Sequence, residues 1–262
     1  MTILHDLIVL FNTTEPGKVY HEVVRIMLQN LFLLPTLSLE QTAELCNTSV
    51  ITINRLLKKI QCPSFRTFKQ RLQDILDGYG RHNRVFPYAQ QSIDELKDTF
   101  FHRLLADTAD LASHIDLAAV ETICGLLHEA RDIHFYCEFS SSHAKQQFQV
   151  DLVYSGKQVI SLCEPADQME DMKNLTRQSV VITTTQAALK HYADHQNMMK
   201  AASKTDAAMV AIVSSLSPIP SHYADYTLSY KGSDTALDNY FIDMLFNLMC
   251  ITYRTKYIDP LY

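Results

Sequence analysis

The sequence of 262 residues has no apolar run that approaches the ~20 residues needed to span a bilayer. Its start, MTILHDLIVLF, is apolar but has neither a basic region before it nor a small-residue cleavage site. We therefore expect a helix of the fold there rather than a signal peptide. The six cysteines are scattered, with no CxxC pair and no histidine partner at metal-ligand spacing. These absences predict a cytoplasmic protein with reduced thiols and no membrane contact.

Motifs of catalysis are missing as well. The chain has no nucleophile elbow, no P-loop and no residue pattern that resembles a catalytic triad. His191 and His195 lie four residues apart on an expected helix, a spacing that suits a metal ion, but the sequence offers no third ligand. We therefore expect no catalytic residue, no metal ion and no other cofactor, and we do not expect an enzyme.

What the chain does have is the composition of a folded soluble protein, 47% hydrophobic and 20% charged. Its formal net charge of −6 is unevenly distributed. Between Ser49 and Arg84, eight lysines and arginines stand against two aspartates, a surplus of +6. A basic segment in an acidic protein is typical of a surface that contacts a polyanion, although a solvated helical face would give the same count.

Residues 39–46 and 50–60 predict two short helices joined by a tight turn. Ser38, with a glutamine three residues later, has the spacing of a capping box. Asn47 tolerates the left-handed conformation of a tight turn, and Ser49 is suited to cap the second helix. This is the pattern of a helix-turn-helix, whose second helix enters the DNA major groove. An ordinary helix pair in an α-helical domain stays the alternative.

The second helix separates an apolar face from a polar one. Its apolar residues recur mostly at i, i+3 and i+4 and should face a core: Val50, Ile53, Leu56, Leu57 and Ile60. The remaining side chains offer hydrogen-bonding groups for base edges and cations for phosphates. We predict that the DNA-binding residues are Thr48, Ser49, Thr52, Asn54, Arg55, Lys58 and Lys59.

Other helices are expected around this pair, over 2–11 and 18–33 before it and over 65–76 after it. The stretch 77–87 holds two of the six glycines and no apolar periodicity, so we expect a domain boundary there. The predicted organisation is an all-α helix-turn-helix domain over 1–78, a linker over 79–92 and a second domain over 93–262.

The second domain alternates helices with short continuous apolar runs. Strands are expected over 133–137, 159–162, 179–184, 208–213 and 226–229. Helices are expected over 93–113, 117–130, 141–155, 166–175, 186–204 and 236–257. This alternation is typical of an α/β domain whose doubly wound parallel sheet is covered on both faces.

The run SLEQTAELCNTSVITINRLLKKIQCPSFRTFKQRL resembles the N-terminal domain of the RpiR family of bacterial sugar-responsive regulators. The matching positions are Ala43, Asn47, Ser49, Thr52, Arg55 and 64–69, with asparagine where the family's turn usually has glycine. The second domain is similar to the family's SIS domain, a doubly wound fold that binds phosphosugars. The resemblance implies a regulator of carbohydrate metabolism, a palindromic double-stranded DNA operator, a phosphosugar effector, and a homodimer or homotetramer.

The expected ligand turns depart from the family pattern. After the first strand the family has a glycine-rich turn, whereas this chain has Cys137-Glu138-Phe139-Ser140. Without glycine the backbone approaches a phosphate less closely, and Glu138 adds a repelling charge. The second turn, usually Ser-x-Ser-Gly-x-Thr, reads Thr-Gln-Ala-Ala-Leu-Lys here. The resemblance implies that the ligand-binding residues are Ser140, Ser141, Thr184, Thr185 and Lys190.

Several alternatives stay open at this stage. The second domain binds a phosphosugar, another ligand, or none, and the serines of residues 140–142 are equally explained as a helix N-cap. Two other functions remain for the whole chain. One is a sugar-phosphate isomerase-like enzyme that uses Glu138 near Ser140, and the other is an interaction protein that binds neither DNA nor a ligand.

Overall fold

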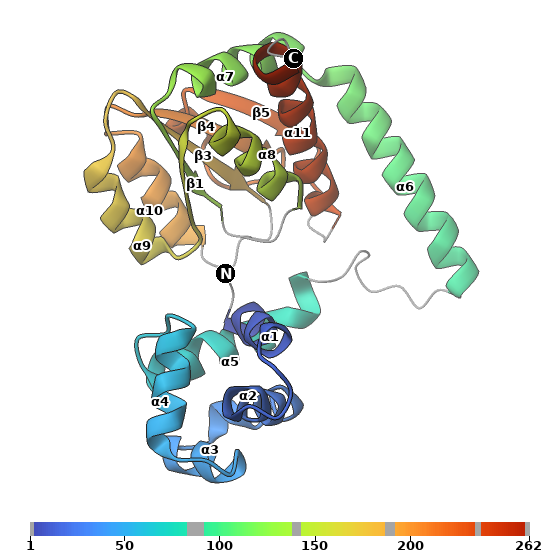
Figure 1. Ribbon diagram of the computed structural model, residues 1–262. Coiled ribbons are helices and arrows are strands. Elements are labelled where there is room, and N and C mark those ends of the chain that lie inside the picture. Colours follow the sequence, from blue (N-terminus) through green and yellow to red (C-terminus); the bar gives the residue numbers. More distant parts are fainter. Residues whose placement is uncertain (1–2, 83–91, 138–142, 187–191, 234–236, 260–262) are drawn as a thin grey trace. The chain divides into compact units, whose positions relative to one another are not determined.

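A computed structural model describes residues 3–82, 92–137, 143–186, 192–233 and 237–259 (Figure 1). The chain divides into two compact units, Met1–Arg81 and His82–Tyr262, which are called unit 1 and unit 2 below. No helix within the described residues combines the length and apolarity that a membrane crossing requires.

Unit 1 is helical throughout its described part. Its elements are α1 (Ile3–Thr13), α2 (Val19–Gln29), the 3-10 turn η1 (Leu34–Thr36), α3 (Leu39–Leu45), α4 (Val50–Lys59) and α5 (Phe65–His82). Their apolar faces form one core, which buries Leu7, Val24, Met27, Leu34, Ala43, Ile53, Leu56, Leu57, Phe68 and Leu72. The inward positions predicted for α4 are confirmed at Ile53, Leu56, Leu57 and Ile60, and Val50 is half-buried at the edge of the core.

Two helices of unit 1 end elsewhere than expected. α2 stops at Gln29 rather than at residue 33, because Asn30 leaves the helical conformation and its side-chain amide donates to the Ile26 carbonyl at 2.8 Å. α5 continues to His82 rather than ending at residue 76, so the expected helix end is wrong, whereas the division between the two units falls within the stretch 77–87. A glycine costs a helix interior about 1 kcal/mol relative to alanine, which does not end a helix of 18 residues.

Unit 2 contains a parallel five-stranded sheet in the order β2-β1-β3-β4-β5. The strands are β1 (Asp132–Tyr136), β2 (Gln158–Leu162), β3 (Ser179–Thr185), β4 (Ala208–Ser214) and β5 (Tyr226–Tyr230). The α/β class with a parallel sheet is therefore confirmed. The strand order reverses between β1 and β3, and in open α/β sheets ligands bind outside the carboxyl ends of the strands at such a point.

Helices cover both faces of this sheet. The chain adds α6 (Ile93–His114), α7 (Leu117–Glu129), α8 (His143–Tyr154), α9 (Pro165–Asp171), η2 (Met172–Asn174), α10 (Tyr192–Ala202), η3 (Ser221–Tyr223), α11 (Asp238–Tyr253) and the π-helix η4 (Arg254–Ile258). α7, α8 and α11 share a core with one face, and α10 and η2 share a core with the other, on the same side of the sheet as α9 (Figure 1). The doubly wound arrangement follows, since β1 and β3 are buried along their whole length.

Three helices of unit 2 differ from their expected spans. The helix predicted from residue 186 is described from Tyr192 onward, and pairing with β4 extends β3 as far as Thr185, one residue beyond the predicted strand. The helix predicted over 166–175 is the short α9 followed by the 3-10 turn η2. The terminal helix begins at Asp238 and changes to a π-helix after Tyr253.

A partly buried ion pair ties α8 to the helix at the end of the described chain. Arg254 donates from Nε and Nη2 to the two carboxylate oxygens of Asp151, each at 2.6 Å. The Cys250 thiol donates to the same carboxylate at 2.8 Å. Burial by itself would raise the pKa of Asp151, but the hydrogen bonds from Arg254 and Cys250 outweigh it and lower that pKa.

Arg254→Met removes the main partner of this carboxylate. A lowered folded pKa means that ionised Asp151 stabilises the fold above the ordinary aspartate value of about 3.9, and that this contribution is lost as pH falls through the folded value. Solvent screens Arg254, whose side chain is 43% exposed. We therefore expect chemical denaturation to show a free energy of unfolding lower by about 1–3 kcal/mol at neutral pH and by less below a pH of about 4.

Arg177→Met is the matched control. Arg177 pairs with Asp206 at 3.5 Å, but both side chains are largely exposed, so this variant should change the free energy of unfolding by less than about 0.5 kcal/mol. Equal losses in the two variants, or a loss at Arg254 that does not shrink in acid, would contradict the assigned role of the Asp151 pair.

Candidate functional site

The predicted turn between α3 and α4 is observed. The Ser38 hydroxyl accepts from the Gln41 backbone at 3.1 Å, and the Gln41 side chain accepts from the Ser38 backbone at 2.8 Å, which is a capping box. Asn47 has φ = 49°, in the left-handed region, and the next backbone N–H, that of Thr48, donates to the Ala43 carbonyl at 2.9 Å. These local hydrogen bonds therefore help to set the direction in which the chain enters α4.

The first turn of α4 uses its hydroxyl groups for capping. Ser49 Oγ accepts from the Thr52 backbone N–H at 3.2 Å and lies 3.0 Å from Thr52 Oγ1. Thr48 and Thr52 are both half-buried. Thr48, Ser49 and Thr52, three of the residues predicted to contact DNA, therefore contribute partly to the fold. The predicted residues with exposed side chains lie further along α4.

The exposed face of α4 is cationic. Asn54, Arg55, Lys58 and Lys59 are all exposed, as predicted from the spacing. Among the described residues no carboxylate forms an ion pair with Arg55, Lys58 or Lys59, and Lys59 Nζ lies 5.8 Å from the centre of the Tyr20 ring. Ile51, which was not among the predicted residues, is also exposed on this helix.

A groove of about 450 Å³ lies beside α5 in the same unit. Its lining residues are Pro35, Leu37, Ser38, Leu39, Phe65, Arg66, Lys69, Gln70 and Gln73. Lys69 donates to the Leu37 carbonyl at 2.8 Å, so this cation holds α5 to the segment before α3. Arg66 is the cation of the groove for which no such contact is seen among the described residues.

In unit 2, the carboxyl ends of β1 and β3 form the second candidate site. Thr184 and Thr185, both predicted to bind the ligand, are the last two residues of β3. Thr185, predicted to begin the second ligand turn, stays in the strand because it pairs with Val213 of β4. Both threonines are buried. Within the described residues, Thr185 Oγ1 has no hydrogen-bond partner, which is unusual for a buried hydroxyl. The other predicted ligand residues, Ser140, Ser141 and Lys190, lie outside the described residues, as does Glu138.

A buried lysine at this edge was missed from the sequence. Lys145, in the first turn of α8, is only 1% exposed, and its charge acts on the Cys137 thiol at the end of β1. Burial still raises the pKa of Cys137 to about 11. The signal was available, because Lys145 shares a helical stripe with Phe148 and Leu152, both of which are buried.

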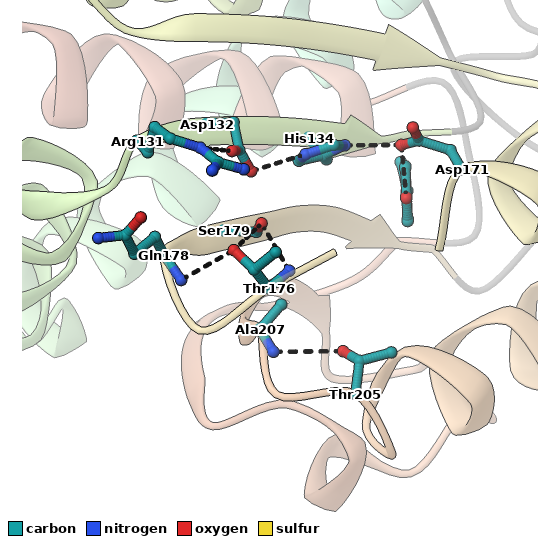
Figure 2. A network of polar contacts seen from close by, with 10 residues as sticks. Arg131, Asp132, His134, Asp171, Thr176, Gln178, Ser179, Thr205 and Ala207 are labelled. Carbon is teal, nitrogen blue, oxygen red and sulfur yellow. Dashed lines mark hydrogen bonds and ion pairs between the residues drawn. The ribbon is translucent and has the colours of Figure 1, made fainter. Parts of the chain in front are cut away.

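The opposite face of the sheet holds a chain of polar contacts (Figure 2). Arg131 donates to Asp132 at 2.6 Å, and His134 bridges Asp132 at 3.0 Å and Asp171 at 2.6 Å. The Tyr136 hydroxyl donates to Asp171 at 2.7 Å. Burial would raise the pKa of Asp132, but hydrogen bonds from Ser179, Arg131 and His134 lower it. This network joins β1 to the end of α9, so its role is positional.

The histidine pair suggested for a metal gains no support. His195 is buried, its Nε2 lies 3.4 Å from Thr183 Oγ1, and burial lowers its pKa to about 4, so the ring is neutral at physiological pH. His191 lies outside the described residues. No group of three or more histidine, cysteine, aspartate or glutamate side chains within the described part of the chain could hold a metal ion.

Comparison with known proteins bears on the fold. No family model and no curated protein matches the sequence. The Vibrio vulnificus NanR protein, solved in complex with ManNAc-6P, has a TM-score of 0.52 at 16% identity over 97% of this chain and 92% of that chain. The sugar isomerase domain of the RpiR transcription factor from Sphaerobacter thermophilus has a TM-score of 0.53 at 14% identity over 62% of this chain and 92% of that domain.

A phosphoheptose isomerase from Francisella tularensis has a TM-score of 0.52 at 10% identity, over 63% of this chain and all of that chain. A regulator and an enzyme thus share the architecture of unit 2. These likenesses show that unit 2 has the sugar isomerase (SIS) fold, as expected, and the fold alone does not separate the two functions.

The capping role of Ser49 can be tested directly. Ser49→Ala removes the acceptor for the Thr52 backbone N–H, which should cost about 1 kcal/mol and raise amide hydrogen exchange in the first turn of α4 by about fivefold. Ser49→Asp is the control, since aspartate caps as well as serine, and it should leave the exchange rates unchanged. Equal rates in wild type and Ser49→Ala would show that the cap contributes nothing.

Proposed function

We propose that this protein is a transcription regulator of the RpiR type that acts on carbohydrate metabolism. In this proposal unit 1 binds a double-stranded DNA operator, unit 2 binds a phosphosugar effector without catalysis, and the protein acts as a homodimer. The observation that carries the proposal is the exposed cationic face of α4, a capped helix that follows a tight turn. The fold likeness to NanR along nearly the whole chain supports it.

The charge distribution favours DNA over an ordinary helix pair. Arg55, Lys58 and Lys59 point outward without carboxylate partners among the described residues, which leaves their charge available for phosphates. Asn54 and Arg55 have the side chains that form bidentate hydrogen bonds with adenine and guanine. In the proposed complex these two read bases, and the lysines at the end of α4 contact the backbone.

Removing cations from this face should weaken DNA binding. For Arg55→Ala and Lys58→Ala we expect lower affinity for an operator enriched from random duplex DNA, measured by fluorescence anisotropy over a series of salt concentrations. Lys58→Ala, which removes a proposed phosphate contact, should also reduce the slope of log K against log salt by about one unit.

Lys18→Ala is a matched control, because it removes the same charge from unit 1 at a lysine that pairs with Glu15 at 3.6 Å. It should bind the operator like the wild type. Unchanged affinity and slope in both α4 variants would refute the assigned face, and equal weakening in all three variants would indicate only a general charge effect.

In this proposal the carboxyl ends of β1 and β3 in unit 2 bind an anionic effector. The SIS fold places ligands at the carboxyl ends of its strands, where Thr185 has a buried hydroxyl without a partner among the described residues and Lys145 brings a buried positive charge. The NanR structure contains ManNAc-6P. An effector would control DNA binding only through different affinities for the DNA-competent and incompetent states.

Exposed apolar side chains on unit 2 support the proposed homodimer. Val150, Val153 and Tyr154 on α8 and Ile251 on α11 are each more than half exposed. Apolar side chains that gather on adjacent helices are typical of a protein interface. A two-fold dimer would present two copies of α4 to the two halves of a palindromic operator.

A thermal-shift experiment tests the effector. ManNAc-6P and other phosphosugars should raise the melting temperature while the same sugars without phosphate should not, since a ligand at 100 times its Kd stabilises the native state by about 2.7 kcal/mol. Thr185→Val keeps the shape of the side chain and removes its hydroxyl, so it should reduce the shift without destabilising the free protein.

The same mixtures distinguish the regulator from the enzyme. Unchanged phosphosugars after incubation would support the non-catalytic proposal. Turnover that disappears when Ser140 or Glu138 is replaced would support an isomerase instead. An absence of any shift, with operator binding intact, would remove the phosphosugar from the proposal and leave the DNA-binding part standing.

A further inference from the structure

Ile51 is an apolar side chain that unit 1 leaves in solvent. It lies in the first turn of α4 and is 64% exposed, between the half-buried residues Val50 and Thr52. Burial does not explain an isoleucine here, and helix propensity does not favour one, because a β-branched side chain loses rotamer freedom in a helix. The side chain is therefore available to a partner of unit 1.

The position of Ile51 on the helix indicates which partner. Residues 51, 54, 55 and 58 recur at i, i+3, i+4 and i+7, so Ile51 begins the same stripe that carries Asn54, Arg55 and Lys58. The cations of this stripe attract a polyanion, and a surface bound along the stripe covers Ile51 as well. In helix-turn-helix proteins the N-terminal residues of the second helix contact base edges, and Ile51 occupies that end.

The hydroxyl groups next to Ile51 are engaged in the helix cap, so Ile51 is the side chain at this end of α4 that is left to contact a base. Ser49 and Thr52 hydrogen-bond with each other in the helix cap, so they are less available to bases than their residue types suggest. An isoleucine has no hydrogen bond to offer, but it can exclude water from an apolar group. Among the base edges of the major groove, thymine presents such a group, its 5-methyl.

We propose that Ile51 contacts the 5-methyl group of a thymine in the major groove and thereby selects an A·T pair at one position of each operator half-site. The inference rests on the DNA binding proposed above and adds a residue that determines sequence preference. It does not assign Ile51 any role in affinity for DNA phosphates.

The test exchanges thymine for deoxyuridine, which removes only the methyl group. Full-length protein first enriches an operator from random duplex DNA, and each thymine is then replaced in turn. At one position per half-site the wild type should bind about fourfold more weakly, the value expected for one buried methyl group. Ile51→Ala removes the contact from both half-sites of the proposed dimer, so it should bind the thymine operator about 16-fold more weakly and should not distinguish thymine from deoxyuridine there.

Two controls make the result specific. Ile51→Ala should keep the wild-type salt dependence and melting temperature, since the side chain is exposed and uncharged. Arg55→Ala should bind more weakly but still distinguish thymine from deoxyuridine at the same position.

An Ile51→Ala variant that keeps the wild-type ratio between thymine and deoxyuridine at every position would overturn the inference while leaving DNA binding intact. If the protein enriches no duplex, or if replacing the α4 cations leaves DNA binding unchanged, the proposed function is overturned and the inference with it.

Discussion

The need to cover both faces of a parallel sheet determines the architecture of unit 2. β1 and β3 are buried along their whole length, so α7, α8 and α11 must lie on one side and α9 and α10 on the other. The ladders satisfy the backbone groups inside the sheet, and the strand ends are positions that stay open for another molecule. The candidate ligand site follows from that constraint rather than from a motif, since the glycines that usually mark it are absent.

Buried polar groups show where this fold is tightly determined. On the α9 face, His134 hydrogen-bonds with two aspartates and Tyr136 with one of them, so every member of that network has partners and fixes α9 to β1. Thr185, at the strand end, has no such arrangement within the described residues. A polar network whose members are all hydrogen-bonded specifies the structure, whereas a buried hydroxyl without a partner can accept a hydrogen bond from a ligand or donate one to it.

The sequence was informative wherever the determining contacts are short. The Ser38 cap, the left-handed Asn47 and the Ser49 cap depend on neighbours within four residues, and all three are observed. The strands were also predictable from continuous apolar runs. The end of α5 was not predicted, because Gly78 does not interrupt the helix. The burial of Lys145 was not predicted either, although the stripe that it shares with the buried Phe148 and Leu152 indicates it. For Ser140, Ser141 and Lys190, and for the DNA-binding role of α4, the sequence remains the source of the prediction.

The hydroxyl pair at the start of α4 has a consequence for how such a protein changes over generations. Ser49 and Thr52 secure the helix, while Ile51 and Asn54 project from it with no part in that support. If α4 reads an operator as proposed, substitutions at the projecting positions change its sequence preference at almost no cost in folding stability. Under that proposal, duplicated copies diverge in the DNA that they bind by single substitutions, without a compensating change elsewhere in the chain.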